Sequence, residues 1–257
     1  MKLFTFATSP YARKARMILD LKGVPYEPIE RCYSLDRQPD LRATSERAEV
    51  PVLVLDNGRA IADSTVICEY LEQVYPHPAT FPKDAYERAR MRTIEDLCDR
   101  SFDAIGFGYY FAILRKDAPE AEAMRTAAVD ECRSLLKRLD NELDGRDYFC
   151  DAEPTLADFA AICHVPLASA MRIDLKTLPR LAGWVGRMRA LPVVTADHER
   201  AAKAWKGLDN IAAEFEGPDG RIHWRDSRLE WPVRHGFIDL VAREFHAARM
   251  MFPPDAA

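Results

Sequence analysis

The sequence lacks the features that mark fibrous, disordered or nucleic-acid-binding chains. It has only 11 glycines and 17 prolines in 257 residues, with no repeat and no low-complexity run. Its net charge is −5, from 36 basic and 41 acidic residues, so bulk charge does not favour a polyanionic partner. With 48% hydrophobic residues the composition is that of an ordinary globular protein of one or two domains. We therefore expect a globular chain that does not bind nucleic acid.

Paired cysteines and long apolar runs are also absent. The six cysteines form no Cys-x-x-Cys pair, so we expect reduced, mostly buried thiols, which are typical of the cytoplasm; they lie at positions 32, 68, 98, 132, 150 and 163. The apolar run at residues 3–7 is shorter than the ~7–15 residues of a signal peptide. The run at 159–171 is shorter than the ~20 residues of a spanning helix. We expect a cytoplasmic protein without a membrane segment.

Closely spaced residues that could bind a metal ion are missing as well. The histidines near the carboxyl end, His223, His235 and His246, are too irregularly spaced to indicate a metal site. No metal is therefore expected.

The first 76 residues alternate between strand and helix patterns. The turn Asp56-Asn57-Gly58 predicts a hairpin, and Asp63-Ser64 supplies capping side chains for a helix that stops at Tyr75-Pro76. The predicted order is β-α-β followed by β-β-α, over residues 3–7, 10–22, 24–29, 50–55, 59–62 and 63–75. We expect one α/β domain over residues 1–76.

The rest of the chain has a helical pattern. Prolines 76, 78 and 82 predict a stiff linker at 77–83, followed by an all-helical domain at 84–206. The expected helices cover 83–116, bent at Gly106 and Gly108, then 118–143, 159–171 and a segment from 181 to 191, with a capping box at 155–158. Residues 207–257 contain two of the four tryptophans, so we expect this extension to pack on the helical domain.

Ser9 and Pro10 lie between the first predicted strand and helix. The simpler interpretation is a helix N-cap followed by proline at the first helical position. The functional interpretation is that the Ser9 hydroxyl donates a hydrogen bond to a bound thiolate at the positive end of the helix. Both roles can coexist.

Two further pairs allow a structural and a functional interpretation. Proline in a buried strand removes a backbone donor, and a cis Val50-Pro51 bond would explain its presence there. Asp63 and Ser64 are either plain caps or a site for an ammonium and a carboxylate group.

The combination of these motifs in order resembles the cytosolic glutathione transferase family over residues 1–206. The resemblance implies a thioredoxin-like α/β domain followed by an all-α domain, glutathione as co-substrate, a small electrophile as substrate and a homodimer. The segments that carry it are 9–16 (SPYARKAR), 49–53 (EVPVL), 63–71 (DSTVICEYL), 155–158 (TLAD) and 178–184 (LPRLAGW).

The resemblance also implies roles for individual residues. Ser9 matches the thiol-activating residue of the serine-type classes. Val50 matches the residue whose backbone pairs with the cysteinyl unit of glutathione, and Pro51 matches the family's cis-proline. Asp63 and Ser64 match the anchors of the γ-glutamyl unit.

One position departs from the family pattern. A lysine that helps to hold the glycine carboxylate of glutathione often precedes Val-Pro, and here Glu49 has the opposite charge. The glycine end must then be held otherwise, and Arg47 or Arg13 are candidates. This departure leaves room for a related thiol.

Aromatic residues are the candidates for an electrophile pocket. Tyr11 adjoins the Ser9 motif, and three residues share part of one helical face, Phe107, Tyr110 and Phe111. Such stripes are also typical of core or dimer contacts. Trp224 and Trp231 in the extension are expected to close over the pocket and to favour bulky aromatic substrates.

The first hypothesis is a serine-type glutathione transferase that attacks a hydrophobic electrophile by conjugation, dehalogenation or ether cleavage. The alternatives are a binding protein that kept the fold without catalysis, and a glutathione-dependent isomerase or lyase.

Overall fold

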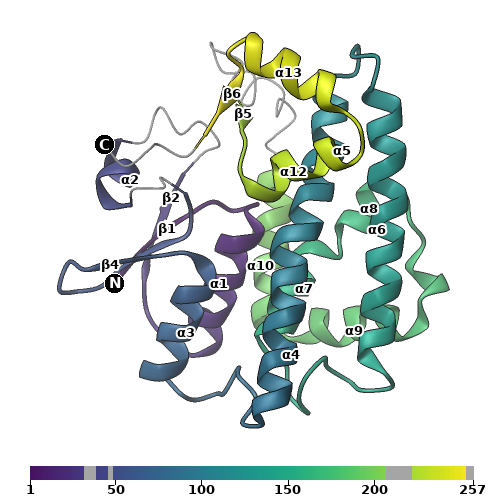
Figure 1. The fold of residues 1–257 in the computed structure, drawn as a ribbon. Helices are drawn as coiled ribbons and strands as arrows, with labels where there is room; N and C mark the ends of the chain where they lie inside the picture. The colour runs from purple at the N-terminus through teal and green to yellow at the C-terminus, as the bar shows by residue number, and fades with distance from the viewer. Residues whose placement is uncertain (32–38, 46–48, 207–221, 253–257) are drawn as a thin grey trace.

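The computed structural model describes residues 1–31, 39–45, 49–206 and 222–252 (Figure 1). The amino-terminal part is a mixed sheet in the order β2-β1-β3-β4, with β1 and β2 parallel and the other neighbours antiparallel. Its elements are β1 (Lys2–Thr5), α1 (Pro10–Leu21), β2 (Glu27–Glu30), α2 (Pro39–Thr44), β3 (Val52–Val54), β4 (Ala60–Ala62) and α3 (Ser64–Val74). The predicted β-α-β and β-β-α order is confirmed.

The part that follows is helical. It contains α4 (Ala85–Asp96), a π-helical turn (Leu97–Phe102), α5 (Asp103–Leu114), α6 (Ala121–Leu143), α7 (Leu156–His164), α8 (Leu167–Ala170), a 3₁₀ turn (Leu175–Thr177), α9 (Pro179–Ala190) and α10 (Pro192–Lys206). The thioredoxin-like α/β part followed by an all-helical part is thus confirmed. No helix among the described residues is long and apolar enough to cross a membrane.

The predicted bend in the first long helix lies elsewhere. The chain departs from α-helical geometry at the π-helical turn, before Gly106 and Gly108. Gly108 has a packing reason instead, because a methyl group there would lie 2.8 Å from Cε3 and 2.9 Å from Cη2 of Trp231. The predicted helix at 159–171 begins earlier, at Leu156, and is interrupted near Pro166.

Two local motifs have the expected geometry. The peptide bond between Val50 and Pro51 is cis. The predicted capping box is present, with the backbone N–H of Thr155 donating to Asp158 at 2.8 Å. Asp158 also accepts from the indole of Trp184 at 2.8 Å, so this cap connects α7 to α9.

Helix α1 lies between the sheet and the helical part. It packs against α3 of the amino-terminal part and against α7 and α10 of the helical part, as Figure 1 shows. Arg13, Lys14 and Arg16 of α1 are buried and face acidic side chains of the helical part. We call this contact the α1 junction.

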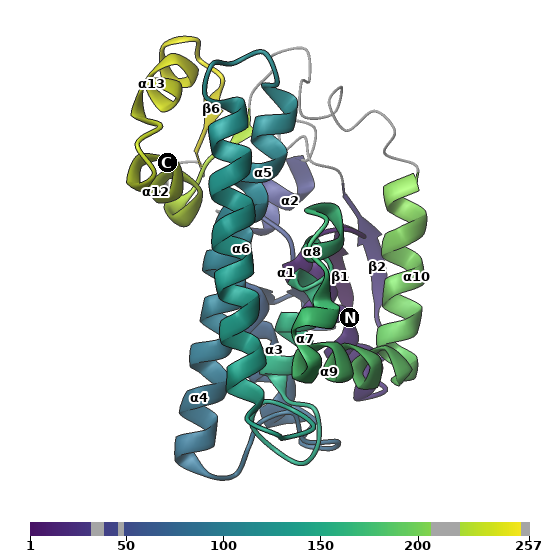
Figure 2. The same cartoon turned by 90° about the vertical axis from the view of Figure 1, so that its right-hand side faces the viewer.

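The described part of the extension sits at the end of the α5–α6 hairpin (Figures 1 and 2). It comprises β5 (Ile222–His223), α12 (Asp226–Arg234), α13 (Ile238–His246) and β6 (Met250–Met251), with β5 and β6 parallel. Trp224 and Trp231 are buried in the same hydrophobic core as the sheet residue Leu3. We call the contact of this segment with α5 and α6 the extension junction.

Candidate functional site

A cleft of about 560 Å³ lies where the amino-terminal part, the helical part and the extension meet. The strand that begins after Pro51 and the start of α3 form one side. The α4 helix and the π-helical turn form the opposite side, and α12 contributes one end. The lining residues are Tyr11, Ser45, Glu49, Val50, Pro51, Ala62, Asp63, Ser64, Thr65, Arg92, Glu95, Asp96, Asp99, Arg100, Arg225, Asp226 and Ser227.

Asp63 and Ser64 occupy the amino terminus of α3 and line the cleft, as the motif predicts. The Asp63 carboxylate accepts from the backbone N–H of Thr65 at 2.8 Å and of Val66 at 3.2 Å, and both bonds use Oδ1. Asp63 has a φ of 78°, which is uncommon for a residue with a side chain. Such strain tends to persist at binding sites, where the surrounding structure enforces it.

Val50 and Pro51 line the cleft beside this helix terminus. The paired part of β3 begins only at Val52, opposite Phe4 of β1, so the Val50 backbone lies just before the sheet ladder. The structure therefore brings together the cis-proline pair and the α3 terminus, two motifs that the sequence analysis assigned to one ligand.

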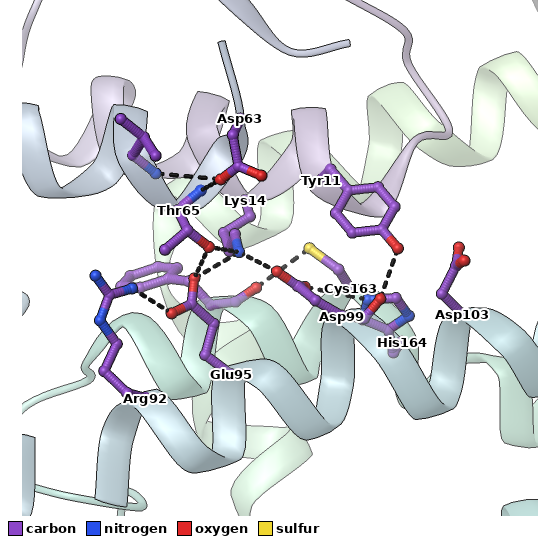
Figure 3. Close-up of polar contacts among 12 residues, drawn as sticks. Tyr11, Lys14, Asp63, Thr65, Arg92, Glu95, Asp99, Asp103, Cys163 and His164 are labelled. Atoms are coloured by element: carbon purple, nitrogen blue, oxygen red, sulfur yellow. Dashed lines mark hydrogen bonds and ion pairs between the residues drawn. The ribbon is translucent and has the colours of Figure 1, made fainter. Parts of the chain in front are cut away.

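A buried ion cluster forms the floor of the cleft (Figure 3). The Lys14 ammonium contacts Glu95 Oε1 at 2.6 Å and Asp99 Oδ2, and the Thr65 hydroxyl donates to Glu95 at 2.7 Å. Burial would lower the pKa of Lys14, but Asp99 and Glu95 outweigh it and raise that pKa. Burial would likewise raise the pKa of Asp99, but Lys14 and His164 lower it. Lys14 and Asp99 therefore stay charged at neutral pH.

Sequence reasoning did not identify this cluster. The available signal was the four-residue spacing of Glu95, Asp99 and Asp103, which places three carboxylates on one face of a helix. Their partner Lys14 is 81 residues away from Glu95, and nothing local connects the two.

Ser9 is the N-cap of α1 and is not among the residues that line this cleft. Its hydroxyl oxygen accepts from the backbone N–H of Ala12 at 3.4 Å. A serine hydroxyl has one proton and two acceptor lone pairs, so this cap leaves the proton for another acceptor. The capping and the thiol-binding interpretations are therefore compatible.

Tyr11 lies in the cleft wall, in the first turn of α1. Its hydroxyl donates to the backbone oxygen of Asp99 at 2.6 Å (Figure 3). Burial raises the pKa of Tyr11 well above its usual value. Because its proton is already donated to the protein, Tyr11 is a poorer hydrogen-bond donor for a thiolate than Ser9.

The two arginines expected to hold the glycine carboxylate of glutathione are not among the described residues that line the cleft. Arg47 lies outside the described residues. Arg13 does not line the cleft: it is buried at the α1 junction, where Nε donates to Asp197 at 2.7 Å. Its guanidinium contacts Asp197 and the backbone oxygen of Cys163 in the helical part, so it does not reach the cleft. The cation in the cleft at Glu49 is Arg225, whose Nη1 lies 3.1 Å from Glu49 Oε1.

The predicted aromatic pocket is filled by its own side chains. Trp224 packs edge-on against Phe107 and Phe111, with ring centroids 4.9 and 5.3 Å apart. Trp231 packs against Gly108 and donates to Glu131 at 2.5 Å. Neither these residues nor Tyr110, whose ring lies edge-on to Tyr109, line the cleft. Of the predicted pocket residues, only Tyr11 does.

The described cysteines do not contribute to the cleft. Cys68, Cys98, Cys132, Cys150 and Cys163 are free and buried. Burial raises the pKa of Cys163 to about 12, so its thiol stays protonated. Within the described ranges, no group of three or more His, Cys, Asp or Glu side chains could hold a metal ion.

The comparison with known proteins agrees with this architecture. The family profile "Glutathione S-transferase, N-terminal domain" matches residues 3–79, and "Glutathione S-transferase, C-terminal domain" matches residues 103–192. Glutathione S-transferase U6 of Arabidopsis thaliana is 30% identical over 223 residues, which are 84% of this chain and 96% of that protein. The chain belongs to the cytosolic glutathione S-transferase family.

Other members of the family support the assignment. The probable glutathione S-transferase BZ2 of Zea mays is 30% identical, covering 87% of this chain and 99% of that protein. A glutathione S-transferase of Methylobacterium radiotolerans, solved with glutathione sulfonate, is 27% identical with a TM-score of 0.68, over 76% of this chain and 93% of that one. A zeta-class maleylpyruvate isomerase is also 27% identical, with a TM-score of 0.66, over 78% and 98%. As a glutathione S-transferase, the chain is an enzyme that uses glutathione.

Proposed function

We propose that this glutathione S-transferase activates the glutathione thiol through Ser9 for attack on an electrophilic carbon. The observation that carries the proposal is the single cleft that brings together the cis Val50-Pro51 pair and the Asp63-Ser64 terminus of α3. The γ-glutamyl carboxylate binds Ser64 and the helix N–H groups, while Asp63 accepts from the ammonium. The cysteinyl unit pairs with the Val50 backbone and extends toward Ser9.

The reaction needs the thiolate and an electrophilic carbon. A free thiol has a pKa of ~8.5, and a hydrogen bond to a charged group is worth ~1.5–3 kcal/mol, which lowers the pKa by about one or two units. The thiolate sulfur then forms a bond to carbon. In a displacement, halide or an ether oxygen leaves with the bonding electron pair. In an addition there is no leaving group: the electron pair of the multiple bond moves to the neighbouring atom, which takes up a proton from water in place of the one that the thiol released.

The experiment replaces Ser9 by alanine. We expect Ser9→Ala to raise the pKa of the bound thiol by about one or two units and to slow conjugation, with glutathione affinity nearly unchanged. Thiolate absorbance against pH measures the first effect, and turnover of a chloronitroaromatic measures the second.

Tyr11→Phe is the matched control, because the Tyr11 hydroxyl already donates to the Asp99 backbone. We expect the bound thiol of this variant to keep the wild-type pKa. An unchanged pKa and rate in Ser9→Ala would remove Ser9 from the mechanism.

A glutathione-dependent isomerase is the second candidate. It is favoured by the charged lining of the cleft and by the similarity to a maleylpyruvate isomerase, since the aromatic side chains expected to hold a bulky apolar substrate are packed against one another. In that case glutathione is not consumed during turnover. A third possibility, a binding protein without catalysis, would retain glutathione and turn over neither class of substrate.

We also propose that the protein works as a homodimer in the cytoplasm. The support is the family membership and the buried, reduced state of the five described cysteines. Sedimentation at micromolar concentration tests the dimer, and a monomer there would contradict it.

A further inference from the structure

Arg225 brings a positive charge to the cleft from far along the chain. It lies just before α12 and lines the cleft together with Glu49, which is 176 residues away in sequence. Its side chain is 18% exposed and that of Glu49 is 17% exposed, so the pair is shielded from bulk water but still accessible from the cleft.

Three contacts hold the Arg225 guanidinium. Nη1 donates to Glu49 at 3.1 Å, and the guanidinium carbon lies 4.6 Å from the centroid of the Tyr11 ring, in cation–π geometry. Nη2 lies 3.8 Å from Asp103 Oδ2. Arg228 donates to both oxygens of Asp103 at 2.8 Å, so Asp103 is satisfied mainly by Arg228 rather than by Arg225.

The guanidinium therefore has bonding capacity left. An arginine carries five N–H donors. Within the described residues, the hydrogen bond to Glu49 is the one that the Arg225 side chain makes. A planar guanidinium held over an aromatic ring is well suited to bind a carboxylate with its remaining N–H groups.

The position of Arg225 matches one end of an extended thiol tripeptide. With the γ-glutamyl unit at Ser64 and the cysteinyl unit at Val50, the next unit lies about 3.3 Å further along, beside Glu49. The glycine unit of glutathione ends in a carboxylate, which Glu49 alone would repel. Among the described residues, Arg225 is the arginine that pairs with Glu49 at that end.

We propose that Arg225 of the C-terminal extension binds the terminal carboxylate of the thiol peptide, and that Glu49 holds the guanidinium in place for it. This inference rests on the proposed function, because it assumes that a thiol peptide occupies the cleft. It makes the extension part of the co-substrate site rather than only a cover on the helical part.

The test compares two ligands on the full chain: glutathione and its glycine monoethyl ester, in which a neutral ethyl ester replaces the terminal carboxylate. Isothermal titration should show that wild type binds glutathione about tenfold more tightly than the ester, equivalent to about 1.4 kcal/mol. In Arg225→Gln this preference should disappear through weaker binding of glutathione, while the affinity for the ester stays unchanged.

Arg228→Gln is the matched control. It removes an arginine three residues further along, within α12, and loosens the extension junction, but Arg228 does not line the cleft. It should keep the preference for glutathione over the ester. Loss of the preference in both variants would mean that Arg225 acts only by docking the extension, which overturns the proposal.

The remaining outcomes separate this inference from the proposed function. If wild type binds both ligands equally, or prefers the ester, the inference fails while the proposed function stands. If wild type binds neither ligand, the proposed function itself fails. The wild-type comparison needs no variant, so equal binding of the two ligands overturns the inference even if Arg225→Gln does not fold.

Discussion

The helical part has two junctions, and they use buried charge differently. At the α1 junction Lys14 is fully buried against Glu95 and Asp99, and Asp197 receives both Arg13 and Arg16. At the extension junction the ion pairs are partly exposed, with Arg228 at 24%, and the large buried groups are the indoles of Trp224 and Trp231.

The difference indicates which junction the fold depends on. A buried charge left without its partner costs far more than the intact pair contributes, so every member of the α1 junction is needed once it is present. Packed indoles stabilise in proportion to the apolar area they bury, so the extension junction can weaken locally while the rest of the core persists. The predictions below test this contrast.

Lys14→Met should give the largest loss of stability. It leaves Asp99 without the buried ammonium and Glu95 with Arg92 as its remaining cation, which is expected to lower the free energy of unfolding by about 3–5 kcal/mol. Chemical denaturation followed by circular dichroism measures this loss. Lys2→Met is the control: Lys2 is 59% exposed in a loose pair with Glu27, and its loss should stay within about 0.5 kcal/mol. Equal effects of the two substitutions would contradict the contrast.

Gly108→Ala should act on the extension junction alone. The added methyl group would collide with the Trp231 ring, and such overpacking costs about 1–3 kcal/mol. We expect faster proteolysis of the extension and a change in tryptophan fluorescence, with the helical part still folded. Gly106→Ala lies on the same helix, and its methyl group would lie 3.4 Å from Leu167, so it should leave the extension docked. An extension that stays docked in Gly108→Ala would be evidence against this packing role.

Acid should weaken the extension junction through Asp103. Burial would raise its pKa, but Arg228 lowers it from 3.8 to about 2. A carboxyl group whose pKa is lower in the folded than in the unfolded chain stabilises the fold at pH values above the unfolded-state pKa. This contribution is lost as the pH falls from about 4 toward 2. The difference in unfolding free energy between wild type and Asp103→Asn should therefore shrink by about 2 kcal/mol over that interval. A difference independent of pH would show that Asp103 contributes no charge effect.

Local motifs were the predictable part of this molecule. The capping box at Thr155 and the capping role of Asp63 follow from residues within a few positions of one another. The cis bond before Pro51 follows from the resemblance to the family, because the Val-Pro pair alone does not specify it. The strand and helix order follows equally from short-range periodicity. These features were sufficient to predict the family fold and one side of the cleft.

Features that depend on distant partners were not predictable in the same way. The pattern of Phe107, Phe111 and Trp224 indicates apolar faces. It does not show whether these side chains line an open pocket or pack against one another. Arg13 and Lys14 look like surface charges on a helix until the acidic residues across the α1 junction are known. Charge pairing over more than eighty residues leaves no local signature.

The ion pair between Glu49 and Arg225 also has a consequence for the timing of synthesis. At about 5–20 residues per second, a ribosome makes the two partners roughly 10–35 s apart. During that interval Glu49 has been made, but the arginine that contacts it in the finished protein has not. The co-substrate site proposed above is therefore complete only after residue 225 has been made.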